Sequence, residues 1–238
     1  MPKAYLTIDD SPSPDTEKLV DFLVAREIPA ILFVRGALME QNPRAIEYAI
    51  KNDILIANHS YAHIPAGEME PQDWADDLEL CDHLIEAAYR RCDKARKIKL
   101  YRFPYIDRGD GIKIEQCDKT TINENEKTQV LQDYLHSYAF RQPFKRTPPG
   151  YPRKASDCLY TFTSRDWMLN DKHRGKHEIK TREDLIARID EDQGLMNEVN
   201  HQILLFHDQP GICDDVCAAI AYLQDKKGFE FLDVLETK

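Results

Sequence analysis

The hydrophobic positions of the chain fall into short runs, which alternate with longer segments of helical spacing. The short runs predict strands at residues 3–8, 30–34, 54–57, 98–101, 159–163, 202–206 and 229–234. Ser13-Pro14 and Asn42-Pro43 are typical helix starts, because a capping side chain precedes a proline. We predict helices after each of these two pairs and at residues 71–95, 124–138, 181–200 and 214–226.

This alternation predicts an α/β fold with a parallel sheet and right-handed crossovers. The pattern alone leaves open whether the sheet closes into a barrel or stays open and doubly wound. Both arrangements place functional side chains at the carboxyl ends of the strands. Residues 107–157 interrupt the alternation and are rich in Asp, Gly, Lys, Asn and Pro. We therefore predict one domain over residues 1–238, with an insertion at about 107–157 between the fourth and fifth strands.

Composition narrows the class of protein. The chain has 42 acidic and 32 basic residues and a net charge of −10, which disfavours a nucleic-acid partner. No apolar run is long enough to span a membrane. The start of the sequence contains no visible export signal, so we expect a cytoplasmic protein whose six cysteines are reduced thiols. Cys213 and Cys217, four residues apart, are expected to be core thiols.

Five polar clusters follow predicted strands directly. They are Asp9-Asp10, His59 with His63, Arg102 with Tyr105, Asp166 with Trp167, and His207. Because the carboxyl ends of parallel strands share one edge, we expect these side chains to converge on one site. Taken alone, each cluster also has a structural explanation; Asp-Asp-Ser-Pro, for example, is typical of a turn.

His59 and His63 are spaced for metal binding. Two imidazoles and one carboxylate are the usual protein ligands of a catalytic zinc ion, which leaves a position for water. The alternative is two unrelated loop histidines. His173 and His177 have the same spacing but lie among Lys172, Arg174 and Lys176, so we expect that pair to be a solvated basic surface.

The remaining clusters suggest acid–base chemistry. His207 could be a general acid for a leaving amine, with Asp166 holding its ring, or simply a histidine at the sheet edge. Arg102 could orient the Asp9 carboxylate through an ion pair, and Trp167 with Leu204 could form a small apolar slot. The chain has neither a G-x-S-x-G turn nor a Gly-rich phosphate loop.

The five segments, in this order, resemble the polysaccharide deacetylases of carbohydrate esterase family four, the NodB homology domain. The family motifs T-[FY]-D-D, H-[ST]-x-x-H, R-x-P-Y, D-x-x-D-W and L-x-x-H correspond here to residues 7–10, 59–63, 102–105, 163–167 and 204–207. The run from Pro29 to Gly36 also resembles the second strand of that family. The resemblance spans nearly the whole chain.

The resemblance implies a distorted, incomplete (β/α)7 barrel and a hydrolase that removes acetyl groups from an N-acetylated sugar or glycan, with a metal-bound water as nucleophile. By analogy Asp9 is the general base, and Asp10, His59 and His63 bind Zn²⁺ or another divalent cation such as Co²⁺ or Ni²⁺. Further roles follow by analogy: Arg102 orients the base, the Tyr105 backbone N–H binds the oxyanion, Asp166 tunes His207 as the general acid, and Trp167 with Leu204 forms the methyl pocket.

The sequence departs from the family pattern at Ile8, Ser11 and Thr163, so the fourth motif is only half present. Two other functions remain open. One is hydrolysis of a small cyclic amide or ureide, for which we expect a closed, small site in place of an open, polar groove. The other is a glycan-binding relative without activity, which the intact ligand and base positions argue against. The expected cytoplasmic location suggests a cytoplasmic sugar as substrate.

Overall fold

The computed structural model describes residues 1–112 and 125–236. Its strands are β1 (Lys3–Ser11), β2 (Ala30–Val34), β3 (Leu55–Asn58), β4 (Phe162–Thr163), β5 (His201–His207) and β6 (Glu230–Phe231). Its α-helices are α1 (Thr16–Ala25), α2 (Gly36–Gln41), α3 (Pro43–Lys51), α4 (Pro71–Arg91), α5 (Glu126–Ser137), α6 (Arg182–Glu191) and α7 (Cys213–Asp225). Short 3₁₀ turns lie at Ala66–Glu68, Pro104–Ile106 and Asp166–Leu169.

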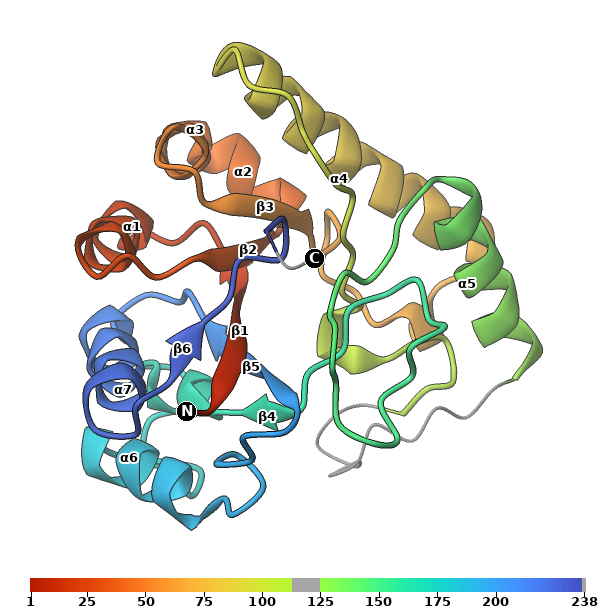
Figure 1. The fold of residues 1–238 in the computed structure, drawn as a ribbon. Helices are drawn as coiled ribbons and strands as arrows, with labels where there is room; N and C mark the ends of the chain where they lie inside the picture. The colour runs from red at the N-terminus through yellow and green to blue at the C-terminus, as the bar shows by residue number, and fades with distance from the viewer. Residues whose placement is uncertain (113–124, 237–238) are drawn as a thin grey trace.

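All pairings of the sheet are parallel, and the strand order is β3-β2-β1-β5-β4, with β6 beside the start of β1. Helices lie along the outer side of this curved sheet, and the segment that carries α5 lies on its other side (Figure 1). The predicted α/β class is confirmed, and the barrel is incomplete, as expected. Between β3 and β4, residues 100–102 bridge the sheet through three backbone hydrogen bonds: Asn58 N–H donates to Leu100 O, Arg102 N–H donates to Asn58 O, and Cys158 N–H donates to Tyr101 O.

The predicted fourth strand, residues 98–101, does not form. Tyr101 and Lys99 make only isolated bridges, to Asn58 and Phe140 respectively. Four other predicted elements are clearly shorter than expected. The fifth strand keeps only Phe162–Thr163 and the seventh only Glu230–Phe231, while the helix from 71 ends at Arg91 and the helix from 181 ends at Glu191. Propensity located these elements, but hydrogen-bonding neighbours determine their lengths.

The alternation of β1 explains its continuous burial. Ala4, Leu6 and Ile8 face the helices and join the larger core cluster, whereas Tyr5 faces the inside of the barrel with Phe33. A parallel strand that is covered on both faces needs apolar residues at both sets of positions. Thr7 and Asp9 share the inner face with Tyr5, so polar side chains of β1 enter the barrel only near its carboxyl end.

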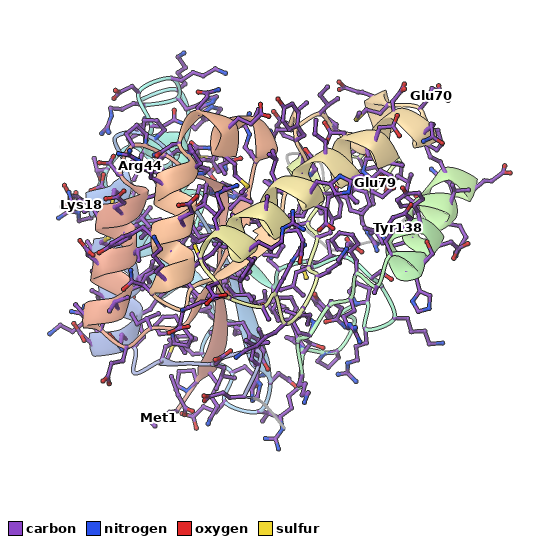
Figure 2. All side chains as sticks on the ribbon, turned by 90° about the horizontal axis from the view of Figure 1, so that it is seen from above. Met1, Lys18, Arg44, Glu70, Glu79 and Tyr138 are labelled. Carbon is purple, nitrogen blue, oxygen red and sulfur yellow. The ribbon has the colours of Figure 1, made fainter. Side chains whose placement is uncertain are left out.

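The region that we predicted as an insertion packs against α4. Figure 2 shows α5, with Tyr138 next to its end, alongside the part of α4 that carries Glu79. Tyr134 donates a hydrogen bond to Glu79, and its ring stacks on Tyr138. The helix predicted at 124–138 is present as Glu126–Ser137, whereas its first residue and the stretch 113–124 lie outside the described residues.

The five described cysteines are free thiols, and Cys117 lies outside the described residues. Cys213 is buried and Cys217 half-buried on α7, and their sulfur atoms lie 3.9 Å apart. Within the described parts of the chain, no helix combines the length and the apolar character needed to cross a bilayer.

Asp208 joins the end of β5 to the loop between β1 and α1. Its buried carboxylate accepts hydrogen bonds of 2.5 Å from the Ser13 and Thr16 hydroxyl groups. Its backbone N–H donates to the Asp9 carbonyl. These bonds fix the two loops that flank the carboxyl end of β1.

We predict that Asp208→Ala lowers the free energy of unfolding by about 2–4 kcal/mol, because two buried hydroxyl groups lose a charged acceptor. Urea denaturation followed by circular dichroism measures this change. Asp214→Ala is the matched control, since Asp214 makes an exposed ion pair with Lys18 and its loss should change stability little. Equal effects of the two substitutions would contradict the structural role of Asp208.

Candidate functional site

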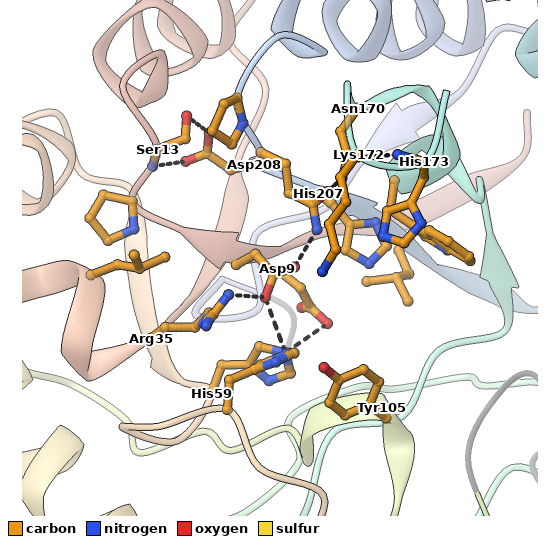
Figure 3. Close-up of a pocket in the computed structure, with 18 of the residues that line it drawn as sticks. Asp9, Ser13, Arg35, His59, Tyr105, Asn170, Lys172, His173, His207 and Asp208 are labelled. Carbon is orange, nitrogen blue, oxygen red and sulfur yellow. Dashed lines mark hydrogen bonds and ion pairs between the residues drawn. The ribbon is translucent and has the colours of Figure 1, made fainter. Parts of the chain in front are cut away.

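A cleft of about 1250 Å³ opens at the carboxyl edge of the sheet. Asp9, His59, Tyr105 and His207 face this cleft from separate segments of the chain (Figure 3). The predicted site residues that line it are Asp9, Asp10, His59, His63, Tyr105, Trp167 and His207. The expected convergence of the five clusters is therefore present, with Arg102 and Asp166 buried just behind the cleft wall.

Asp9 and Asp10 both face this site although they are adjacent in a strand. Neighbouring strand residues normally point to opposite faces. Asp10 has a φ of 68°, in the left-handed region, which turns its side chain to the side that Asp9 already faces. His63 has a φ of 59° as well. Such backbone is unfavourable for non-glycine residues and persists where the surrounding structure enforces it.

Asp10, His59 and His63 form a compact potential metal site. One ligand atom from each lies within 4.8 Å of the others. The Asp10 Oδ1 atom is 3.2 Å from His63 Nε2 and 4.0 Å from His59 Nε2. His59 Nδ1 lies 2.8 Å from the Arg102 carbonyl oxygen, which can accept a hydrogen bond only from a protonated Nδ1. That bond leaves Nε2 of His59 unprotonated in the neutral ring, as metal ligation requires.

The chemistry of these atoms fits a divalent cation. Asp10 Oδ1 is buried and has no hydrogen-bond partner, whereas Oδ2 accepts a hydrogen bond from Gln209. Burial favours the neutral carboxylic acid, but His63, His59, His207 and Arg35 outweigh it and lower the pKa of Asp10. Burial, with His59, Arg35 and His207, outweighs the opposing charge of Asp10 and lowers the pKa of His63 to about 3. An ionised carboxylate beside a neutral imidazole is the ligand state that a metal needs.

Asp9 has a different partner. Its Oδ1 atom accepts a hydrogen bond of 2.8 Å from Arg102 Nη1, which also donates to Thr7 Oγ1. The Arg102 side chain is fully buried, and its guanidinium carbon lies 4.3 Å from the centre of the Phe33 ring. The other oxygen, Asp9 Oδ2, lies 3.6 Å from His59 Nε2 and lines the cleft. The buried Arg102 thus orients the Asp9 carboxylate through Oδ1, while Oδ2 is directed to the potential metal site.

His207 and Asp166 form a third pair. Asp166 Oδ1 is 2.8 Å from His207 Nδ1, and Asp166 Oδ2 accepts from the His207 backbone N–H. Ser164 Oγ donates to Asp166 Oδ1 and fixes the carboxylate. Burial disfavours the imidazolium, but the charge and hydrogen bond of Asp166 outweigh it and raise the pKa of His207 to about 9. An imidazole with such a pKa carries a proton near neutral pH that it can donate.

One predicted site residue is misplaced. The Leu204 side chain is buried in the core between sheet and helices and does not line the cleft. Leu205 lines it instead, because Leu205 and His207 lie on the inner face of β5, opposite Leu204. The assignment of Leu204 to the apolar slot is wrong, since residues one position apart in a strand face opposite sides.

The sequence interpretation also missed three side chains of the cleft. Arg35, after β2, and Gln209, after β5, both approach Asp10. His173 is half-buried and lines the cleft, with its ring centre 5.1 Å from that of Trp167, and the ring centre of His177 lies 5.0 Å from that of Trp167 and 5.5 Å from that of His173. The expectation of a solvated basic pair at His173 and His177 is thus wrong. Their position after Trp167 in the same loop was the available signal.

Comparison with known proteins gives the chain a family. Residues 1–122 match the family model described as polysaccharide deacetylase. Relatives include chitooligosaccharide deacetylases from Bradyrhizobium sp. (strain ANU 289), 31% identical over 85 residues, and from Sinorhizobium fredii (strain NBRC 101917 / NGR234), 36% identical over 63 residues. These alignments cover 35% and 26% of this chain, and 39% and 29% of the relatives. The chain thus matches less than half the length of these relatives.

Solved structures share the fold over nearly the whole chain. A family 4 carbohydrate esterase from Streptomyces lividans, in complex with acetate, has a TM-score of 0.65 at 18% identity and covers 99% of this chain and 95% of its own. A CE4 family pseudoenzyme from Bacillus anthracis has a TM-score of 0.64 at 15% identity, covering 96% of this chain and 62% of its own. With the family-model match over half of its length, this chain belongs to the polysaccharide deacetylase family.

Proposed function

We propose that this protein is a metal-dependent N-deacetylase that hydrolyses the acetamido group of an N-acetylated sugar or glycan. One observation carries the proposal: a carboxylate paired with Arg102, a potential metal site and a histidine paired with Asp166 all face one cleft. These three units supply a proton acceptor, a cation site and a proton donor for amide hydrolysis. The names of the chitooligosaccharide deacetylases that resemble this chain support the same substrate class.

In the proposed reaction, Asp9 takes a proton from the attacking water, and Arg102 keeps the carboxylate pointed at it. Asp10, His59 and His63 would hold a divalent cation, which would polarise the amide carbonyl and lower the pKa of water. The Tyr105 backbone N–H is assigned to the developing oxyanion. His207 donates its proton to the nitrogen as the C–N bond breaks, so that acetate and a free amine leave. Trp167 and Leu205 form the wall for the acetyl methyl group.

We propose zinc as the cation, because two imidazoles and one carboxylate are typical zinc ligands, with cobalt or nickel as alternatives. The cleft volume favours a sugar or glycan over a small cyclic ureide, since about 1250 Å³ exceeds the usual range for small-molecule pockets. A silent binding relative is the second alternative, and a pseudoenzyme does share this fold. The base, ligand and acid positions are all occupied here by groups with their own partners, which favours an enzyme.

We predict that purified protein reconstituted with Zn²⁺ binds one ion per chain and that His63→Ala loses it. Two ligands bind a cation far more weakly than three, because each ligand contributes to the affinity. His177→Ala is the matched control, since it removes a histidine of the same H-x-x-x-H spacing. Elemental analysis after dialysis measures the metal content. Equal content in both variants would exclude the Asp10–His59–His63 site.

Acetate release from N-acetylglucosamine oligomers tests the activity. We predict that Asp9→Asn and His207→Ala each lower kcat by about 10²–10⁴-fold, because each removes a proton-transfer group. His136→Ala, on the exposed side of α5, should leave the rate unchanged. Bound oligomer without acetate release from the metal-loaded wild type would favour a binding protein. Release from a cyclic ureide but not from any N-acetyl sugar would favour the other alternative.

The raised pKa of His207 gives a pH dependence. A general acid works only while protonated, so kcat/KM should fall as pH rises through about 9. In Asp166→Asn the stabilising charge is lost while burial remains, so we predict that this alkaline limb moves down by about two pH units. Steady-state kinetics between pH 5 and 10, on the order of ten pH values, measure the shift. An alkaline limb at the same pH in the variant would remove His207 as the acid.

A further inference from the structure

Arg35 lies in the cleft beside the potential metal site, with no adequate partner of its own. Its side chain is partly exposed, and its nearest carboxylate oxygen, Asp10 Oδ1, is 3.8 Å from Nη1, beyond hydrogen-bond distance. The Nε atom is buried and has no hydrogen-bond partner among the described residues. A buried guanidinium N–H without an acceptor is unfavourable. Arg35 therefore presents unused donor capacity to whatever occupies the cleft.

The neighbouring carboxylate does not account for this position. Asp10 already accepts a hydrogen bond from Gln209 and faces the imidazoles of His59 and His63. A cation bound to these three ligands would neutralise the negative charge of Asp10 and would repel the Arg35 guanidinium a few ångströms away. An anion bound to Arg35 removes that repulsion, because it lies between two positive charges.

Lys172 supplies a second cation on the other side of Asp9. Figure 3 shows Lys172 extending from its loop into the cleft, with Arg35 across from it. Within the described residues, the Lys172 amine makes no hydrogen bond or ion pair. Besides Asp10, two buried acids line the cleft, and both are already paired, Asp9 with Arg102 and Asp208 with Ser13 and Thr16. Neither cation is neutralised by them.

The positive charges of Arg35 and Lys172 in the cleft contrast with the net negative charge of the chain. The chain as a whole carries a net charge of −10, so a general attraction for anions is not the explanation. A neutral N-acetyl sugar offers hydroxyl groups, which need no guanidinium. A carboxylate or phosphate, by contrast, matches the planar donor fork of arginine and can accept two hydrogen bonds from it.

We propose that the substrate carries an anionic substituent, a carboxylate or a phosphate on the N-acetylated sugar, and that Arg35 binds it with Lys172 on the opposite side. This inference rests on the proposed deacetylase function and deepens it. Arg35 and Lys172 are then specificity residues: they select the substrate, whereas the proton transfers belong to Asp9 and His207.

The activity test compares kcat/KM for N-acetylmuramic acid, which carries a carboxylate, N-acetylglucosamine 6-phosphate and neutral N-acetylglucosamine oligomers. Wild type should prefer one of the two anionic substrates, and that substrate identifies the anion. In Arg35→Gln the preference over the neutral oligomer should fall about ten- to hundredfold, chiefly through KM. Lys172→Gln should lower it less, since an exposed amine contributes less. Arg35→Lys should keep part of this preference, because lysine retains the positive charge but lacks the planar pair of guanidinium donors.

Arg44→Gln is the control, because Arg44 is exposed on α3 (Figure 2), is not among the residues that line the cleft, and its loss is the same change of charge. This control should leave the preference unchanged. An equal loss of preference in Arg44→Gln, an equal loss on neutral and anionic substrates in Arg35→Gln, or no preference in wild type would overturn the proposal.

A binding measurement separates this proposal from the proposed function. Calorimetry with the same anionic sugars and with inorganic phosphate, on metal-free and zinc-loaded protein, does not depend on turnover. We expect binding in wild type and about tenfold weaker binding in Arg35→Gln. Weaker anion binding in Arg35→Gln, together with no acetate release from any sugar, would support the anion site and contradict the deacetylase function. Acetate release by the wild type, together with equal anion binding in wild type and Arg35→Gln, would support the deacetylase function and contradict the anion site.

Discussion

The buried guanidinium of Arg102 is the interaction on which the site depends. It lies where the barrel fails to close, and it donates to Asp9 and Thr7 of β1 and to the Cys158 carbonyl across the gap. Its backbone pairs with Asn58, and its carbonyl accepts from His59 Nδ1. Removing one partner of a buried ion pair costs about 3–5 kcal/mol. A single residue thus holds the barrel interior, the Asp9 carboxylate and one imidazole of the potential metal site in place.

A second constraint is the separation of charges. Asp9 and Asp10 would repel each other if they shared one environment. Arg102 pairs with the Asp9 carboxylate inside the barrel. The Asp10 carboxylate lies on the cleft side, among the imidazoles of His59 and His63, Gln209 and Arg35. His207 is held by Asp166, which comes from another segment. Because each group has its own partner, the Asp9 carboxylate, the Asp10 carboxylate and the His207 imidazole can be adjacent without neutralising one another.

The sequence predicted most of this site because its signals are local. Each polar cluster directly follows an apolar run, so position along the chain was enough to place it at the sheet edge. The errors concern properties that depend on partners. Residues 98–101 have strand-like composition, but they meet β3 at one bridge only. Leu204 and Leu205 are identical in type, and only the register of β5 against β1, Thr7 with Leu205 and Asp9 with His207, decides which enters the cleft.

The charged side chains that the sequence did not reveal also have a physical explanation. Arg35 is one arginine among many in the chain, and its distance from Asp10 follows from the neighbouring positions of β1 and β2, where Val34 pairs with Ser11. His173 and His177 are adjacent to lysines and arginine in the sequence, yet the 3₁₀ turn at Asp166–Leu169 places Trp167 in contact with both rings, and His173 lines the cleft. Long-range placement, not composition, turned an apparently solvated basic stretch into a wall of the site.

Fold similarity alone does not decide activity in this family, because an esterase and a pseudoenzyme have nearly equal TM-scores with this chain. The discrimination must come from individual atoms. Asp10 Oδ1 is the most informative, since a buried carboxylate oxygen without a donor is costly in any protein that does not bind a cation there. A site retained only for glycan binding gains nothing from that cost, nor from a buried Asp166 that keeps His207 protonated. Both features have a physical purpose when a cation is bound and a proton is transferred.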